Sequence, residues 1–221
     1  MIKIRWKKEM YFSVVLNFCA AVGFSQTNLM PVTHYVFPEF TKGIVLMKNG
    51  NENEAILNYN SLTEEMIFDN RGTKLALGQL EMIDTVFIGF RKFIPKDNSF
   101  IELVLKAKYS LYVAYKCKLN DPGKPAGYGT TSQTSAITSY SKFFTNGKVY
   151  DMKLPEGYGT QPFIEYWLDK DGKLNKFISI RQLSKLFDEH ESVFKAYIKK
   201  HDVNYANQSS VVELIKSLQN N

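Results

Sequence analysis

Residues 109–119 read YSLYVAYKCKL, and two kinds of side chain alternate along this stretch. The odd-numbered positions, from Tyr109 to Leu119, are apolar or aromatic, and the even-numbered positions include Lys116 and Lys118. Successive side chains of a β-strand point to opposite faces of the sheet. The stretch therefore predicts a strand that turns one face to a hydrophobic core and a more polar face the other way.

Short segments of the same kind flank this strand and are separated by Gly, Asn and Asp, which is typical of an antiparallel sheet. The pattern predicts strands over residues 42–48, 54–59, 65–69, 73–77, 83–91, 100–105 and 109–119, with Pro95 ending strand pairing after residue 94. Residues 121–141 lack a hydrophobic period and are predicted to form a long loop. Two hairpins are then expected, residues 142–145 with 148–152 and residues 164–168 with 174–178.

The predicted fold is mainly β (α+β). We expect an antiparallel β-sandwich or a strongly curved sheet over residues 42–178, or alternatively a partly open barrel. Residues 179–221 change to a helical period and predict three short helices that pack on the sheet. Ser179 with Gln182 and Ser210 with Glu213 each have the spacing of a capping box at the start of a helix.

The N-terminus has the three parts of a secretory signal peptide. A basic segment, residues 1–10, is followed by an almost uncharged apolar segment, residues 11–24. Gly23 and Ser25 place small residues at positions −3 and −1 of a cut before Gln26. A membrane anchor is the alternative, but an apolar run of about 14 residues is shorter than the roughly 20 that span a bilayer. We expect cleavage of residues 1–25, an extended lead-in over residues 26–41, and a protein located in the periplasm or at the cell surface.

The charge and cysteine content of the chain support this reading. The net charge is +6, and residues 1–25 contribute +3 of it through four basic residues and Glu9. The remaining charges are interspersed, without the basic stripe that a nucleic-acid partner needs, so no such partner is expected. After cleavage Cys117 is the single cysteine, which excludes an internal disulfide, and its strand position predicts a small buried residue.

The sequence lacks the motifs of common catalytic and metal sites. His190 and His201 are eleven residues apart, whereas helical zinc ligands are usually spaced i and i+4. There is no G-x-S-x-G motif for a serine hydrolase and no phosphate-binding G-x-x-x-x-G-K-[ST] motif. We therefore expect no catalytic residues of these kinds, no metal and no cofactor.

A repeated Gly-Tyr-Gly-Thr, at residues 127–130 and 157–160, is the candidate ligand-binding feature. Glycine lets the backbone approach a ligand closely, and tyrosine offers a flat amphipathic surface. If both loops lie near one end of the sheet, their side chains can form a shallow site for an envelope glycan or a protein segment. The candidate residues are Tyr128, Thr130, Tyr158 and Thr160. The alternative is that both loops are glycine-rich turns whose tyrosines fold back on the sheet.

The signal ending in Phe24-Ser25-Gln26 and the tail segments LFDEHE, residues 186–191, and YIKK, residues 197–200, give the chain a family resemblance. It resembles uncharacterised exported β-rich proteins of the Bacteroidetes. The resemblance covers the signal and the tail only. It implies export and implies no activity and no site residues.

Three function classes follow from these observations. The first is an exported, non-catalytic binding module or accessory protein of the cell envelope. The second is a hydrolase of envelope polymers whose carboxylates are brought together by folding, and two carboxyl groups about 5 to 10 Å apart in a cavity would favour it. The third is a structural or assembly subunit, which would show an unpaired edge strand or a large exposed apolar patch.

Overall fold

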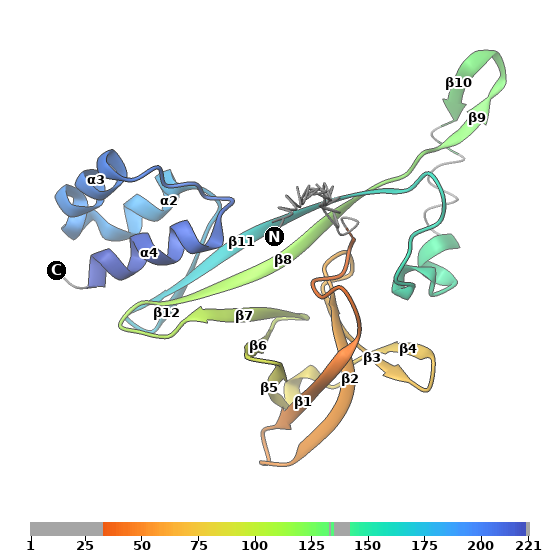
Figure 1. The fold of residues 1–221 in the computed structure, drawn as a ribbon, viewed down its shortest axis with the longest axis horizontal. Helices are drawn as coiled ribbons and strands as arrows, with labels where there is room; N and C mark the ends of the chain where they lie inside the picture. The colour runs from red at the N-terminus through yellow and green to blue at the C-terminus, as the bar shows by residue number, and fades with distance from the viewer. Residues whose placement is uncertain (1–32, 133, 135–141, 220–221) are drawn as a thin grey trace, which may run out of the picture. The chain divides into compact units, whose positions relative to one another are not determined.

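The fold was obtained as a computed structural model that describes residues 33–132, 134 and 142–219 (Figure 1). These residues belong to one compact unit, Pro31–Asn221. The predicted signal peptide and most of the lead-in lie outside the described residues. Ten strands form one antiparallel sheet in the order β12-β11-β8-β7-β6-β5-β1-β2-β3-β4, and helices follow it at the C-terminal end of the chain, which confirms the predicted fold class.

The bounds of the sheet strands agree with the sequence pattern at most positions. They are β1 Thr41–Met47, β2 Glu52–Asn60, β3 Glu65–Asn70, β4 Thr73–Ala76, β5 Ile83–Ile88, β6 Arg91–Lys96, β7 Ser99–Leu105, β8 Ser110–Asn120, β11 Gly159–Lys170 and β12 Lys173–Phe177. The first four strands form a meander, and β5 then returns to pair with the free edge of β1. From β5 the chain continues outward strand by strand to β12.

The sheet is curved and does not close. Tyr59 of β2 stacks on Phe93 of β6 with ring centroids 5.9 Å apart, and its hydroxyl donates to the carbonyl of Phe100 in β7 at 3.3 Å. Strands that are far apart in the sheet order therefore face each other across a shared core. The members of this core come from β1, β2, β3, β5, β6 and β7: Val45, Leu57, Tyr59, Met66, Ile83, Val86, Ile88, Phe93 and Phe100.

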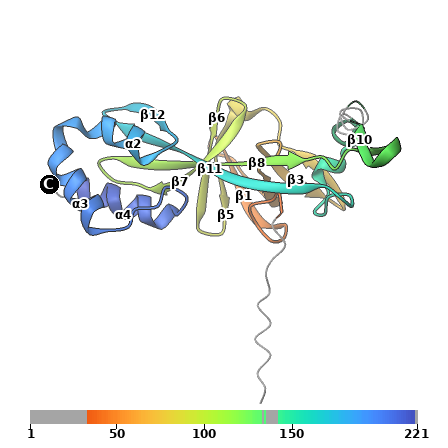
Figure 2. The same cartoon turned by 90° about the horizontal axis from the view of Figure 1, so that it is seen from above.

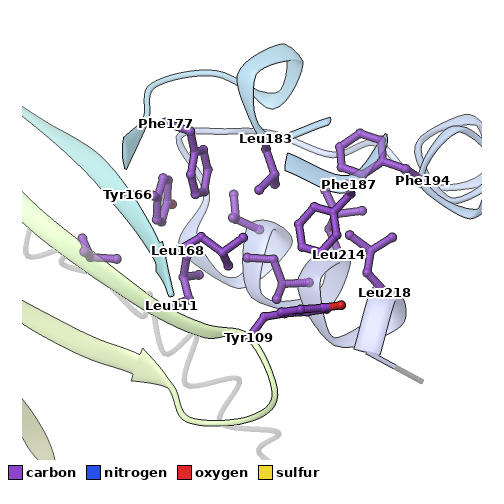
Figure 3. Packing of buried hydrophobic residues seen from close by; sticks show 13 residues of the cluster. Tyr109, Leu111, Tyr166, Leu168, Phe177, Leu183, Phe187, Phe194, Leu214 and Leu218 are labelled. Atoms are coloured by element: carbon purple, nitrogen blue, oxygen red, sulfur yellow. The ribbon is translucent and has the colours of Figure 1, made fainter. Parts of the chain in front are cut away.

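The C-terminal helices cover one face of β8, β11 and β12 (Figures 1 and 2). They are α2 Ile180–Ser184, η4 Lys185–His190, α3 Glu191–Lys200 and α4 Gln208–Gln219. Tyr166 and Leu168 of β11 meet Phe187 and Leu214 of the helices in a second buried core, shown in Figure 3. Short helices are marginal alone, so this core is what holds the tail on the sheet. No helix among the described residues is long and apolar enough to cross a membrane.

The predicted strand over residues 83–91 is wrong in its extent. The chain turns at Gly89-Phe90, so this region forms the hairpin of β5 and β6. Gly89 has a φ of 58°, a left-handed conformation that glycine adopts without strain. Pro95 lies inside β6. This is possible because β5 pairs with β6 only as far as Phe93, so no backbone amide is needed at residue 95 to donate to β5.

The predicted hairpin of residues 142–145 and 148–152 is also wrong. Residues 142–145 are helical, with the amide of Asn146 donating to the carbonyl of Lys142 at 3.0 Å, and Lys148–Tyr150 form the 3₁₀ turn η3. Gly147, with a φ of 69°, separates the two. This segment does not join the sheet, although among the described residues β12 pairs only with Tyr166–Lys170 of β11 and leaves the edge of the first half of β11 open. The predicted loop 121–141 contains a small hairpin, β9 Lys124–Ala126 and β10 Thr130–Ser132, around the 3₁₀ turn η2 Gly127–Gly129.

One of the two predicted helix caps is confirmed. Ser179 precedes α2, and its hydroxyl accepts from the amide of Gln182 at 3.2 Å. The second cap is displaced, because α4 begins at Gln208, before Ser210. Asn207 takes the capping position, and its side-chain oxygen accepts from the amide of Ser210 at 3.3 Å. Asparagine is as good a cap as serine, so the earlier start costs nothing.

Candidate functional site

A pocket of about 370 Å³ lies on the face of β8, β11 and β12 that points away from the helices. Tyr166 and Leu168 are buried under the helices, so Glu165 and Trp167 point to the opposite face because side chains alternate along β11. The floor of the pocket is made by Ala114, Lys116, Glu165, Trp167 and Lys176. The strand register brings them together, since Trp167 pairs directly with Tyr112 on one side and with Lys176 on the other.

Two tight turns from the curved part of the sheet form the walls of the pocket. Thr63 and Glu64 belong to the β2–β3 turn, and residues 96–99 belong to the β6–β7 turn. Glu64 and Asp97 each adopt a left-handed backbone conformation there, with φ values of 61° and 55°. The side chain of Asn60 fixes the first turn by accepting from the amides of residues 62 and 63.

Lysine and acidic side chains alternate around the pocket and pair with one another. The Lys116 ammonium lies 2.7 Å from Glu64 and 3.7 Å from Glu165, and Lys176 lies 2.8 Å from Glu165. Lys96 pairs with Asp97 at 2.7 Å. Three ammonium groups thus match three carboxylates, and the lining has no formal net charge.

Trp167 is the aromatic centre of the pocket. The Lys96 ammonium lies 4.2 Å from the centroid of its ring, and the Lys176 ammonium lies 5.9 Å from it. Asn98, Ser99 and Thr63 add uncharged polar groups at the rim. The Thr63 hydroxyl is buried and has no hydrogen-bond partner among the residues that the structure describes. The pocket thus combines one aromatic surface with many donors and acceptors.

The two Gly-Tyr-Gly-Thr segments do not line this pocket. They do emerge at the same end of the β8–β11 pair, because Gly159 pairs with Asn120, the last residue of β8, and the β9–β10 hairpin follows shortly after it. The Thr130 hydroxyl donates to the carbonyl of Gly127 at 3.0 Å. Thr160 is the second residue of β11 and pairs with Leu119.

Tyr158 packs inward. Its ring stacks on the buried ring of Phe143 with centroids 5.4 Å apart, and its hydroxyl donates to Asp121 at 3.1 Å. Burial raises the pKa of the Tyr158 phenol. The side chain of Tyr128 lies outside the described part of the structure, so its role as a ligand contact stays a prediction. Thr130, Tyr158 and Thr160 are described by the structure, but their role as ligand contacts also stays a prediction.

The sequence reading assigned no role to Trp167, Glu165 or Lys116. A usable signal was present, because β11 reads FIEYWL from Phe163 to Leu168. Aromatic residues stand on both faces of this strand, yet only one face can be buried under the helices. Large aromatic residues on the second face, next to a glutamate, indicate a binding surface more than a core.

The side chains of Cys117, His34 and His201 are held by contacts within the fold. Cys117 is half-buried, burial raises the pKa of its thiol, and the thiol contacts the carbonyl of Lys118 at 3.4 Å. His34 is buried, and its Nε2 donates to the carbonyl of Val149 at 3.0 Å. His201 stacks on Tyr197. No group of three or more metal-ligating side chains occurs within residues 33–132, 134 and 142–219.

Comparison with models of known protein families, with curated proteins and with solved structures found no match to this chain.

Proposed function

We propose that the protein is an exported, non-catalytic module that binds a neutral glycan of the cell envelope in the Trp167 pocket. The observation that carries the proposal is a half-buried tryptophan surrounded by charge-balanced polar side chains. Sugars present an apolar C–H face and a rim of hydroxyl groups, which fits one aromatic ring with donors and acceptors around it. The signal-peptide pattern of residues 1–25 supports an envelope location for such a ligand.

The charge balance favours a neutral ligand over an anionic or cationic one. Each acidic side chain that could repel an anion is paired with a lysine, and each lysine that could attract one is paired with an acid. A charged ligand would have to break these lysine–acid pairs, and it could then pair with only one of the two separated side chains and would leave the other unpaired. Hydroxyl groups can accept from the ammonium groups and donate to the carboxylates while the pairs persist.

Lys96 must move from the tryptophan ring when a sugar stacks there, and the structure makes this movement inexpensive. Its partner Asp97 has 83% of its side chain exposed, and an exposed ion pair contributes about 0–1 kcal/mol. The Lys96 side chain itself is 20% exposed, and a partly desolvated cation–π contact contributes about 1–2 kcal/mol. The cost of displacement is therefore small compared with the burial of an aromatic surface against a ligand.

The test uses the intrinsic fluorescence of the pocket. The chain has two tryptophans, Trp6 and Trp167, and Trp6 lies in the predicted signal peptide, so fluorescence of the cleaved protein reports on the pocket. Titration with neutral tetrasaccharides of β-1,4-linked glucose, N-acetylglucosamine or xylose should change this fluorescence for at least one of them. Tetragalacturonate, a polyanion of similar size, should not bind.

Two variants complete the test by calorimetry. Trp167→Ala should abolish binding, whereas Phe90→Ala, which removes a fully exposed aromatic ring in the β5–β6 turn, should not change it. Unchanged melting temperatures would show that both variants fold. Equal affinity of Trp167→Ala and the unchanged protein would refute the proposed site.

A hydrolase of envelope polymers is the second candidate, favoured by the presence of Glu64 and Glu165 in one pocket. Glycoside hydrolysis requires one carboxyl group in its protonated form and, for inversion, space for a water molecule between the two. Here the Lys116 ammonium lies 2.7 Å from Glu64 and 3.7 Å from Glu165, so both carboxylates are engaged in ion pairs with the same lysine. The geometry therefore favours binding. Release of reducing ends from the bound tetrasaccharide, lost in Glu165→Gln, would reverse this preference.

A further inference from the structure

We propose that the ligand is an extended glycan chain that lies along β11, with Phe163 as a second stacking position beyond the Trp167 pocket. This inference rests on the proposed function and adds the length and direction of the ligand. Gln161, Phe163, Glu165 and Trp167 follow one another at every second position of β11 and so point to the same face.

Phe163 is placed to contact a ligand. It retains 37% of its surface exposed, although it lies on a strand whose other face is packed under helices. Its direct cross-strand partner is Lys116, a residue of the pocket floor, so the Phe163 surface continues the pocket without a break in the sheet. The Lys118 ammonium lies 5.5 Å from the centroid of the Phe163 ring.

The arrangement around Phe163 repeats that around Trp167. In both places a lysine ammonium lies over an aromatic ring, at 5.5 Å for Phe163 and at 4.2 Å for Trp167. Glu165 lies between the two rings on β11, and its carboxylate can accept from hydroxyl groups, whereas Lys116, beside Phe163 on β8, can donate to them. Two aromatic side chains with a polar side chain between them form a linear series of proposed subsites.

The spacing of the two rings requires a ligand longer than one sugar. Phe163 and Trp167 are four residues apart on a strand that rises about 3.3 Å per residue, which places them roughly 13 Å apart. A single pyranose ring cannot contact both. An extended, ribbon-like chain, such as a β-1,4-linked oligosaccharide, can follow the strand and stack on both rings.

The β8–β11 pair also continues past the pocket in the direction of Phe163. The β7–β8 pairing covers β8 from Leu111 to Val113, whereas the β8–β11 pairing continues to Asn120 and Gly159. The described helices α2, α3 and α4 pack on the opposite face. The paired strands β8 and β11 therefore extend the proposed binding surface from the pocket toward the end of the sheet where both Gly-Tyr-Gly-Thr segments emerge.

The experiment measures affinity against chain length. Binding of β-1,4-linked oligomers of glucose, N-acetylglucosamine and xylose, from two to six units, is followed by calorimetry for the unchanged protein, Phe163→Ala and Trp167→Ala. For the oligomer that binds, affinity of the unchanged protein should rise at least tenfold between two and six units. Phe163→Ala should bind the dimer equally well but lose most of this rise, and Trp167→Ala should lose binding at every length.

The outcomes separate this inference from the proposed function. A dimer that binds through Trp167 with no gain for longer oligomers would refute the extended site and leave the pocket function intact. A Phe163→Ala variant that binds the hexamer as tightly as the unchanged protein would do the same. Failure of every oligomer to bind the unchanged protein would refute both. Phe90→Ala serves as the matched control for loss of an exposed phenylalanine.

Discussion

Replacement of Glu102 by leucine is expected to lower the free energy of unfolding by about 3 kcal/mol. Glu102 has 5% of its surface exposed, and its two carboxylate oxygens accept from the Arg91 guanidinium at 2.8 and 2.7 Å. Tyr115 donates to the same carboxylate at 2.5 Å and is itself in contact with Gln208 of α4. Leucine fills most of the space of the glutamate but leaves the guanidinium without this partner, next to the rings of Phe37 and Tyr115.

The magnitude follows from the burial of the two partners. Removal of one member of a buried ion pair costs about 3–5 kcal/mol, because the remaining charge is left uncompensated. Arg91 keeps 30% of its side chain exposed, so water can recover part of the loss and the lower end of this range applies. For a domain of this size 1 kcal/mol corresponds to about 2–4 °C in melting temperature, so the midpoint should fall by roughly 6–12 °C.

A double-mutant cycle checks the explanation. Urea unfolding, followed by Trp167 fluorescence, is measured for Glu102→Leu, Arg91→Met and the double variant. The double variant should be more stable than Glu102→Leu alone, because it removes the uncompensated charge. Glu213→Ala, which breaks an exposed pair with Lys216, is the control and should change stability by less than about 0.5 kcal/mol. A double variant as unstable as the sum of both single variants would contradict the reasoning.

Three further outcomes are expected from stability measurements. Burial lowers the pKa of His34, so the unfolded chain binds a proton more readily than the folded protein. The free energy of unfolding should be full above about pH 6.5 and fall as the pH drops below it, and it should fall less in His34→Gln. Parallel pH profiles of the two proteins would contradict a role of His34. Gly43→Ala should cost about 1–3 kcal/mol, because the added Cβ would lie 2.5 Å from the Phe87 carbonyl oxygen, while Gly78→Ala, with open space around it, should be nearly neutral by thermal melting. Asn207→Ala should cost about 1 kcal/mol in urea unfolding through loss of the α4 cap, and unchanged stability of this variant would contradict the assignment of Asn207 as the cap.

The hydrophobic period of each segment predicted most individual strands and the helical tail, because this period depends only on residues that are neighbours in the chain. The alternation of residues 109–119 corresponds to β8, and Asp171-Gly172 forms the turn between β11 and β12. The exceptions are also local: a turn at the positive-φ Gly89 ended the predicted strand 83–91 at Ile88, and residues 142–145 closed a helical turn instead of forming a strand. Short apolar segments have no period that distinguishes a strand from one helical turn.

The pocket could not be predicted in the same way, because long-range pairing assembles it. Its lining comes from two turns and from the strands β7, β8, β11 and β12, which lie far apart in the chain. These elements meet because β5 returns to pair with β1 and because the sheet curves until Tyr59 reaches Phe100. No pattern of adjacent residues encodes either event. Sequence reasoning therefore favoured the conspicuous Gly-Tyr-Gly-Thr repeat over the ordinary-looking strand that carries Trp167.

The alternation of β11 explains how one strand can support the helices on one face and carry the proposed binding site on the other. Tyr166 and Leu168 are fully buried and hold the helices, whereas Glu165 and Trp167 face the pocket one position away. Because the two sets point to opposite faces, a change in the pocket does not disturb the packing under the helices. The Lys116–Glu64 and Lys176–Glu165 pairs hold their side chains in place before any ligand binds, which lowers the entropy that binding must overcome, whereas Lys96 has to move. A charge-balanced lining on a sheet face would therefore suit the proposed glycan, whose affinity should increase with each proposed subsite that it reaches.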